Sequence, residues 1–132
     1  MLTDEQFARI LEFRVALRRF GRFSEEQASK LGMTAAQHQL LLAIRGHGDP
    51  LGPSIADVAR HLLIRHHSVV GLVDRTQELG LIERHRDEGD HRLVRLTLTP
   101  LGRERVNALA VAHLKELRDL AEVLGALLDA DA

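Results

Sequence analysis

The stretch that decides the fold of this chain runs from Ser68 to Gly102 and reads SVVGLVDRTQELGLIERHRDEGDHRLVRLTLTPLG. Its first part, residues 68–80, has the spacing of a short amphipathic helix that ends at a glycine. Residues 81–86 and 92–99 then read as two strands joined by a turn. A helix of this size fits the major groove of DNA, and a basic hairpin beside it can reach the adjacent minor groove. This order of elements predicts a surface that reads double-stranded DNA.

A second short helix is predicted just upstream, over residues 54–62. Its apolar residues fall on one helical stripe, at Ile55, Val58, Ala59 and Leu62. About three residues separate it from the next helix, which is the spacing of a helix-turn-helix motif. In that next helix the residues expected to face the core are Val69, Leu72, Val73, Thr76 and Leu79. Gly80 then provides the left-handed exit that such a helix commonly uses.

Helix starts recur along the chain as residue pairs with capping-box spacing or a close analogue of it. The pairs are Thr3 with Gln6, Ser24 with Gln27, Thr34 with Gln37, and Ser54 with Asp57. They predict helices near residues 3–20, 24–31, 34–46 and 54–62. Thr99 followed by Pro100 predicts the start of a last helix, which continues to about residue 128.

The first and last predicted helices carry more apolar surface than a small domain needs. The apolar stripe of the last helix continues for about 28 residues, a length of roughly 40 Å. We expect the spare length to pack on a second copy of the chain. The residues predicted for this dimer contact are Phe7, Ile10, Leu11, Leu17, Leu109, His113, Leu117, Leu120 and Leu124.

The composition excludes several classes of protein. The 132 residues suit one domain. They include no cysteine, which excludes disulfides, thiolate catalysis and cysteine-based zinc sites. Four phenylalanines, with no tryptophan or tyrosine, argue against a stacking platform for single-stranded nucleic acid. No apolar run approaches the ~18 residues of a membrane span, and no secretory signal is visible. We therefore expect a cytoplasmic protein with no membrane partner.

The charge of the chain is a weaker guide than its motifs. The net charge of −1 does not suggest a nonspecific coat of nucleic acid. Acids and bases nearly balance between Arg60 and Arg95, although five of the eight histidines also fall there. Partial protonation of these histidines would make the stretch more basic as the pH falls toward ~6.

With these elements in place, the chain resembles the MarR family of bacterial winged-helix regulators. The wing pattern of that family is Asp-x-Arg followed by a strand that ends in Leu-Thr-x-x-Gly. It stands here at residues 90–102 as DHRLVRLTLTPLG. Residues 55–59, 72–84 and 33–41 also match the style of the family. The resemblance covers essentially the whole chain.

The resemblance implies a mainly α (α+β) fold, a winged helix-turn-helix with N- and C-terminal dimerisation helices. It implies one domain over residues 1–132, with the winged helix at about 34–99 and the dimerisation helices at about 3–20 and 100–128. Two features depart from the family pattern. The chain stops near Leu128, so the second of the two usual C-terminal dimerisation helices is expected to be shortened or absent. The helix entry at residues 65–68 has two histidines where many members carry small residues or proline.

Arg92 is the first residue that we expect to contact DNA, because an arginine at a hairpin tip can insert into a narrow A·T-rich minor groove. Asp90 is expected to orient an arginine of the hairpin, either Arg84 or Arg92. Gly71 would let the backbone of the helix approach the bases. The full predicted DNA-binding set is Arg65, His66, His67, Ser68, Gly71, Arg75, Arg84, Arg86, Asp90, Arg92 and Arg95. The alternatives are helix capping for the histidine pair and plain surface charges for Arg75, Arg86 and Arg95.

The resemblance implies a sequence-specific, homodimeric transcriptional regulator, a ligand-responsive repressor that binds a pseudo-palindromic DNA operator and a small-molecule effector. A winged-helix protein-interaction module without DNA binding is the alternative, and the near-neutral charge favours it slightly. The eight histidines also suggest a metal-responsive sensor. However, only His113 with Glu116 has a helical spacing suited to metal, and two ligands are too few. We expect no catalytic residue, no metal ligand and no cofactor.

Overall fold

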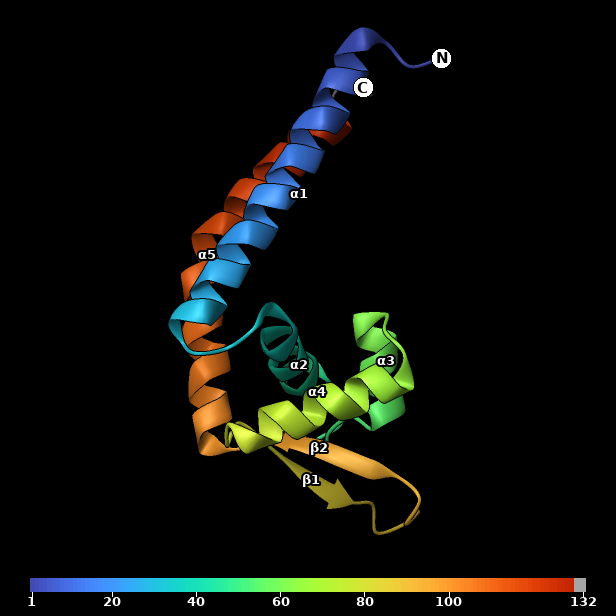
Figure 1. Cartoon of the computed structure of the whole chain (residues 1–132). Coiled ribbons are helices and arrows are strands. Elements are labelled where there is room, and N and C mark those ends of the chain that lie inside the picture. Colours follow the sequence, from blue (N-terminus) through green and yellow to red (C-terminus); the bar gives the residue numbers. More distant parts are fainter. Residues whose placement is uncertain (130–132) are drawn as a thin grey trace.

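The computed structural model describes residues 1–129 as five helices and one two-stranded antiparallel sheet (Figure 1). In chain order the elements are α1 (Asp4–Lys30), α2 (Ala35–Gly46), α3 (Ile55–Leu62), α4 (His66–Glu78), β1 (Ile82–Arg86), β2 (Val94–Leu98) and α5 (Pro100–Asp129). This arrangement is the predicted winged helix-turn-helix with N- and C-terminal helices.

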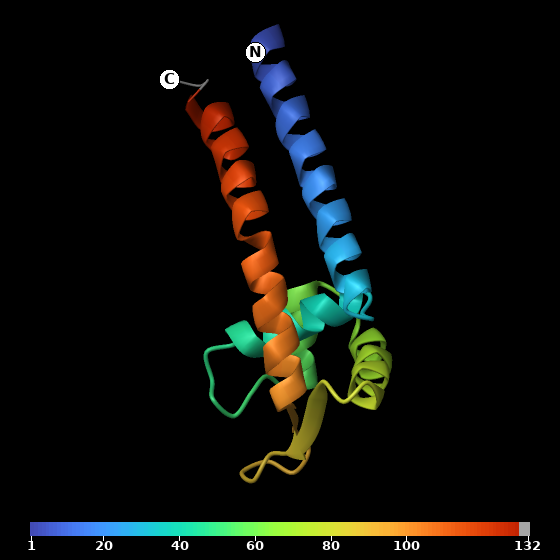
Figure 2. The same cartoon turned by 90° about the vertical axis from the view of Figure 1, so that its left-hand side faces the viewer.

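The molecule has two parts, which we call the stalk and the winged lobe. The stalk consists of α1 and α5, which lie side by side in both views (Figures 1 and 2). The winged lobe consists of α2, α3, α4 and the β1–β2 hairpin, gathered where α1 ends and α5 begins. The N-terminus and the end of α5 lie at the same end of the stalk, the end opposite the lobe (Figure 1). The stalk therefore projects away from the lobe and exposes much of its length.

Three of the four predicted capping boxes are present and define helix starts. Thr3, Thr34 and Ser54 each accept a hydrogen bond from the backbone N–H three residues on, and the side chain of that residue accepts one in return. Each box satisfies two N–H groups that would otherwise have no partner within the helix. At the start of α5, Oγ1 of Thr99 accepts from the backbone N–H of Gly102 at 3.1 Å. The prediction from the Thr99–Pro100 pair is thus confirmed.

The fourth pair, Ser24 with Gln27, does not start a helix. Since α1 runs without interruption to Lys30, the predicted end near residue 20 and the separate helix at 24–31 are wrong. Ser24 is buried, and its Oγ lies 3.4 Å from Nδ1 of His38 on α2. The hydroxyl of Ser24 is thus within hydrogen-bond distance of a side chain on another helix. The local spacing had instead predicted that it caps the start of a helix.

The helix-turn-helix motif is formed by α3 and α4, with residues 63–65 between them as predicted. The buried side chains on the inner faces of the two helices are Val58, Val69, Leu72, Val73 and Thr76. The prediction that Leu79 also faces the core is wrong, because this side chain is exposed. α4 ends at Glu78, and the chain then turns at Gly80 with a φ of 75°. The helical stripe does not extend to Leu79 for this reason.

The hairpin is fastened to the lobe along β2. The register runs from the pair Ile82–Leu98 at the base to the pair Arg86–Val94 toward the tip. Leu96 is fully buried, and its N–H donates to the carbonyl oxygen of Pro53 at 2.9 Å. The base of the hairpin is thereby held against the loop that precedes α3.

Gly102 allows the first turn of α5 to pack against the base of the hairpin. A Cβ at this position would lie 2.0 Å from the carbonyl oxygen of Leu81. The close approach explains why the Leu-Thr-x-x-Gly pattern requires its glycine. No helix among residues 1–129 combines the length and the apolarity that crossing a membrane requires.

Candidate nucleic-acid interface

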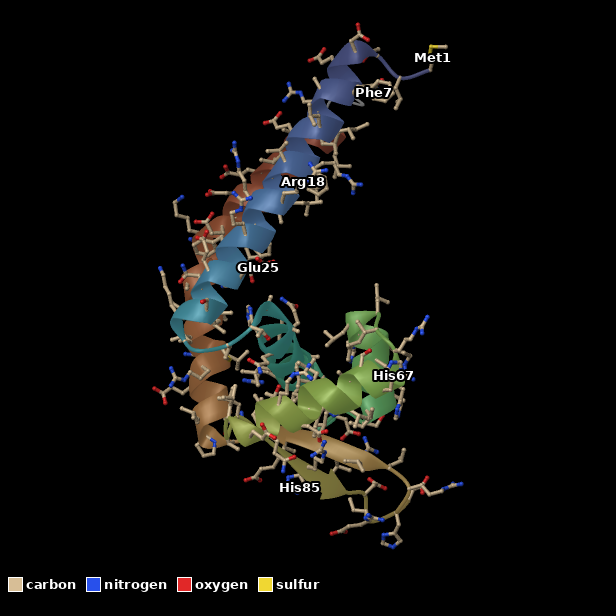
Figure 3. All side chains as sticks on the ribbon, viewed as in Figure 1. Met1, Phe7, Arg18, Glu25, His67 and His85 are labelled. Carbon is tan, nitrogen blue, oxygen red and sulfur yellow. The ribbon has the colours of Figure 1, made fainter. Side chains whose placement is uncertain are left out.

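The outer face of α4 carries most of the residues predicted to read bases. The N-cap residue of α4, Arg65, makes no capping hydrogen bond with its side chain. The N–H of Ser68 donates to the carbonyl oxygen of Arg65 at 3.0 Å, so the N–H groups of His66 and His67 are the ones that an outside acceptor such as phosphate could use. The predicted residues that are exposed here are Arg65, His66, His67, Ser68 and Arg75. Figure 3 shows His67 at the end of α4 that is remote from the stalk. Gly71 is half-buried, and a Cβ there would lie 3.3 Å from Nη1 of Arg75.

The tip of the hairpin presents Arg92 to solvent. Nε of Arg92 donates to Oδ1 of Asp90 at 3.1 Å, and the backbone N–H of Arg92 donates to the same oxygen at 3.0 Å. The side-chain hydrogen bond from Arg92, and then the backbone one, lower the pKa of Asp90 and keep it charged. Asp87 in turn accepts from the backbone N–H of Asp90 at 2.8 Å. Arg92 remains 91% exposed. Asp90 therefore orients Arg92, which is one of its two predicted partners.

Arg84, the other predicted partner of Asp90, lies elsewhere. From β1 its guanidinium reaches α4, where it forms an ion pair with Asp74 and donates to Oε1 of Gln77 at 2.6 Å. The pairing of Asp90 with Arg84 is therefore wrong. We call the contact of Arg84 with Asp74 and Gln77 the α4–wing clamp, because it joins the hairpin to α4. Asp74 offsets part of the charge that Arg84 could otherwise offer to a phosphate.

Arg95 points into the lobe rather than toward solvent, and its side chain is only 19% exposed. Its Nε donates to Oδ1 of Asp87 at 3.2 Å, and its Nη1 donates to the carbonyl oxygen of Gly52 at 3.1 Å. Asp49 lies 3.5 Å from the same Nη1. The backbone N–H of Asp90, and then Arg95, lower the pKa of Asp87. Arg95 is therefore not the plain surface charge of the alternative interpretation. It fastens the hairpin to the loop before α3.

A cleft of about 290 Å³ lies between α4, the start of α3 and the hairpin. Residues of its walls include Ser54, His66, Val70, Arg84, Arg92 and Val94. Arg86 is exposed on the hairpin and donates to the carbonyl oxygen of His91 at 3.2 Å. Figure 3 shows His85 on β1, below α4, on the part of the lobe that faces away from the stalk. The predicted residues of α4 and of the hairpin tip thus flank one surface.

The residues predicted for a dimer contact divide into two groups. The exposed ones are Phe7, Ile10, Leu11, Leu17, Leu117 and Leu124, and Leu120 is half-buried. Leu109 and His113 are buried within the chain, so their assignment to an exposed contact surface is wrong. Near the lobe, this face of α5 is covered by α1 and α2. Farther along, a groove of about 590 Å³ lies between α1 and α5.

The partners of Arg84 and Arg95 could not be predicted from the sequence. Asp74 and Gln77 hold Arg84, but no helical or strand periodicity connects residues that lie on α4 and β1. A weak signal was present, since Asp74 and Gln77 stand three residues apart on one face of the predicted helix. In the described part of the chain, no group of three or more His, Cys, Asp or Glu side chains could hold a metal ion.

Comparison with known proteins covers the lobe that carries this surface. Residues 31–93, from the end of α1 to the tip of the hairpin, match the sequence model of the MarR family. This segment of the chain is therefore similar to the MarR family. The resemblance drawn from the wing and helix motifs is thereby confirmed.

A curated MarR-like relative and two solved structures extend the comparison. The chain is 28% identical over 92 residues to the HTH-type transcriptional regulator PecS of Dickeya dadantii (strain 3937), which covers 70% of this chain and 55% of PecS. The chain thus spans about half the length of this relative. The S. aureus MepR–DNA complex matches with a TM-score of 0.73 at 20% identity, over 92% of this chain and 85% of MepR. Bordetella bronchiseptica BpsR, whose DNA binding is regulated by 6-hydroxynicotinic acid, matches with a TM-score of 0.66 at 28% identity, over 91% of this chain and 82% of BpsR.

Proposed function

We propose that this MarR-like chain is a sequence-specific transcriptional regulator that binds double-stranded DNA. One observation carries the proposal: the exposed, uncapped start of α4 and the Arg92 tip of the hairpin flank one surface. α4 has 13 residues and is therefore about 20 Å long, which suits a major groove. Arg92 can then enter the neighbouring minor groove. The function of PecS as a transcriptional regulator and the complex of MepR with DNA support this assignment.

The functional unit in this proposal is a homodimer on a pseudo-palindromic site. The exposed apolar side chains of the stalk, among them Phe7, Leu11 and Leu117, supply a surface that a second copy would cover. Figure 3 shows Phe7 near the free end of the stalk, far from the lobe. Two copies joined through their stalks leave both lobes free. The two α4 helices must then lie about 34 Å apart to enter successive major grooves.

We assign the chain a repressor role that responds to a small molecule. The groove of about 590 Å³ between α1 and α5 is of a size that holds small ligands. The regulation of BpsR by 6-hydroxynicotinic acid supports this part of the proposal by similarity. An effector of this kind acts only if it binds the DNA-incompetent arrangement of the lobes more tightly than the competent one.

A module that binds protein without binding DNA is the second candidate. Its supporting observation is electrostatic: Arg84 is paired with Asp74, and Arg95 is paired with Asp87 and Asp49. These pairings, together with a net charge of −1, reduce the positive field of the lobe. The two candidates differ in the dependence of DNA binding on salt.

The test is fluorescence anisotropy with labelled duplexes taken from upstream of the gene itself, over a salt series. If the three exposed arginines 65, 75 and 86 each contact one phosphate, a dimer makes six contacts. The slope of log K against log salt is then about −5. Arg92→Ala is expected to weaken binding to the preferred duplex by roughly 5- to 100-fold. Arg18→Ala, an exposed change on α1, is the matched control and should leave binding intact.

Two results would contradict the proposal. One is the absence of salt-dependent binding to any upstream duplex, which would favour the protein-interaction module. The other is an equal loss of affinity in Arg92→Ala and Arg18→Ala, because binding would then not depend on the hairpin tip.

A further inference from the structure

Two buried histidines meet where the stalk joins the winged lobe. His38 lies on α2 and His113 on α5, and each is only 5% exposed. Their ring centroids are 5.3 Å apart. Phe20 and Phe23 of α1 contact the ring of His113 edge-on, at centroid distances of 5.7 and 5.2 Å. We call His38 and His113 the junction histidines, because they connect helices of both parts of the molecule.

The hydrogen bonds of the junction histidines fit uncharged rings. Nδ1 of His113 lies 2.5 Å from the carbonyl oxygen of Leu109, so this nitrogen carries a proton and donates it. Nε2 of His113 is buried and has no hydrogen-bond partner, so a second proton would find no acceptor there. Nδ1 of His38 lies 3.4 Å from Oγ of Ser24, which can donate to it. An orphaned nitrogen of this kind is uncommon inside proteins and points to a functional constraint.

No carboxylate is in place to compensate a charge on either ring. Among residues 1–129, the only histidines within ion-pairing distance of a carboxylate are His47 and His85. Burial, and then the neighbouring His113, lower the pKa of His38. A proton on either ring would therefore create a cation with no partner, and a proton on both would add their mutual repulsion.

The charged groups around the site lie outside it. On α2 the only other charged side chain is Arg45, near the far end of the helix. On α1 the charged residues nearest the site along the helix are Arg19, Arg22, Glu25 and Glu26, all exposed. On α5 they are Lys115, which is exposed, and Glu116, which is half-buried. Arg19 and Glu116 both line the groove beside the junction. The contacts of the two rings include two phenylalanines, one serine hydroxyl and the carbonyl oxygen of Leu109.

We infer that the junction histidines form an acid-sensitive connection whose protonation displaces the winged lobe from the stalk and releases DNA. The lobe meets the stalk at α2 and at the base of the hairpin, and α2 also packs on α4. A change in the packing of α2 on α1 and α5 is therefore passed to α4. A charged ring must be hydrated, and hydration requires this packing to open. In a dimer held by its stalks, even a small displacement changes the spacing of the two α4 helices. This inference rests on the proposed function, because its biological output is DNA binding.

Acidification favours the open junction, because the open form binds a proton more readily than the closed form. The closed junction disfavours the charged ring, whereas the open junction lets the ring titrate near its ordinary value of ~6.5. The closed junction is therefore fully stable above that value and loses stability as the pH falls below it. For one histidine, moving from about pH 7.5 to about pH 5.5 favours the open form by about tenfold.

Two exposed histidines on α4 would have the opposite effect on DNA affinity. His66 and His67 face outward beside the proposed DNA surface. A positive charge on them would strengthen binding to phosphate as the pH falls. A loss of affinity on acidification therefore cannot come from these residues.

The experiment measures two quantities between about pH 7.5 and about pH 5.5 at constant salt: affinity for the preferred duplex and midpoint of thermal unfolding. The variants are His38→Asn, whose Oδ1 can occupy the place of Nδ1, and His113→Leu, which removes the orphaned nitrogen. His85→Asn, on the exposed wing, is the control. Circular dichroism establishes that each variant folds. If His113→Leu does not fold, His113→Gln replaces it, and NMR titration of the two imidazoles in the unmodified protein gives an independent measurement.

The wild type and His85→Asn should lose about tenfold or more in DNA affinity on acidification, with a falling melting temperature. His38→Asn and His113→Leu should lose less, and the double variant should hold its affinity or gain. The inference is overturned if the double variant keeps the acid sensitivity of the wild type, or if the wild type has none. Should the protein bind no duplex at any pH, the proposed function fails. The pH profile of thermal unfolding, or NMR titration of the two rings near their ordinary value, would then still decide whether the junction is acid-sensitive.

Discussion

Replacing Arg95 with alanine should destabilise the protein by much more than replacing a solvent-facing arginine of the same hairpin. The wild-type guanidinium donates to Asp87 and to the carbonyl oxygen of Gly52, and it also lies near Asp49. A hydrogen bond to a charged group contributes about 1.5–3 kcal/mol net to the free energy of unfolding, and an ion pair with an exposed partner contributes less. Because the carboxylates are partly solvated, we expect a total cost of about 2 kcal/mol. For a chain of this size the melting temperature should fall by roughly 6–10 °C.

The assay is thermal unfolding followed by circular dichroism, at one fixed protein concentration because a dimer has a concentration-dependent midpoint. Arg86→Ala is the matched control, since Arg86 is exposed and donates a hydrogen bond to the carbonyl oxygen of His91 in the same hairpin. Arg95→Lys should fall between the two, because lysine keeps the charge but cannot donate in two directions from a rigid fork. A midpoint for Arg95→Ala within about 2 °C of that for Arg86→Ala would refute the role of Arg95 as the fastener of the hairpin.

Three further predictions concern other parts of the fold. Gly102→Ala should lower the free energy of unfolding, measured in urea, by about 2 kcal/mol or more, because the new Cβ would collide with Leu81. Gly21→Ala in α1 is the control: its Cβ meets no neighbouring atom, so it should raise the free energy of unfolding by up to ~1 kcal/mol. Leu63 has a φ of 56° and is 90% exposed, so Leu63→Asn should stabilise the protein by about 0.5–1 kcal/mol; a loss in the same urea titration would show that the leucine makes a stabilising contact. The pKa of Asp57 is lowered, first because the backbone N–H of Ser54, the N-cap of α3, donates to its carboxylate. Charged Asp57 therefore stabilises the protein above the ordinary pKa of 3.8, and this stabilisation is lost as the pH falls through the lowered pKa. Acid titration of Asp57→Asn should lack this component, and an unchanged acid limb would contradict the assignment.

The position of the arginines has a consequence for how the proposed regulator reads DNA. Two of the predicted DNA-binding arginines, Arg84 and Arg95, hold the hairpin in place, whereas Arg92 is exposed at its tip, where Asp90 orients it. The loss of Arg84 would therefore weaken DNA binding through a displaced wing. The loss of Arg92 would remove the contact itself and leave the fold intact.

The local elements of the fold could be predicted from the sequence with good accuracy. Thr3, Thr34 and Ser54 begin helices as expected, and Gly80 ends α4 in the left-handed region. The hairpin and the three-residue turn of the helix-turn-helix also lie where the pattern placed them. All of these features depend on hydrogen bonds and backbone conformations within four residues of one another, or on a simple apolar period.

The errors arose where a distant partner decides the outcome. Ser24 has the local spacing of a cap, yet it lies inside α1 because His38 takes up its hydroxyl. Leu109 and His113 share an apolar stripe with exposed leucines, but α1 and α2 cover only the part of the stripe that lies near the lobe. Periodicity identifies a face of a helix without specifying what covers it at each turn.

The amino-acid sequence by itself indicated the resemblance to the MarR family, the order of the elements from α2 to α5, and the candidate DNA-reading residues of α4 and the hairpin tip. Only the tertiary structure decided which arginines are exposed, which carboxylates hold the others, and that two histidines meet in a buried site without a counter-charge. The physical reason is the range of the interactions. Caps, turns and periodic faces depend on neighbours along the chain, whereas ion pairs and buried polar contacts form between side chains that only the packing of separate elements brings together.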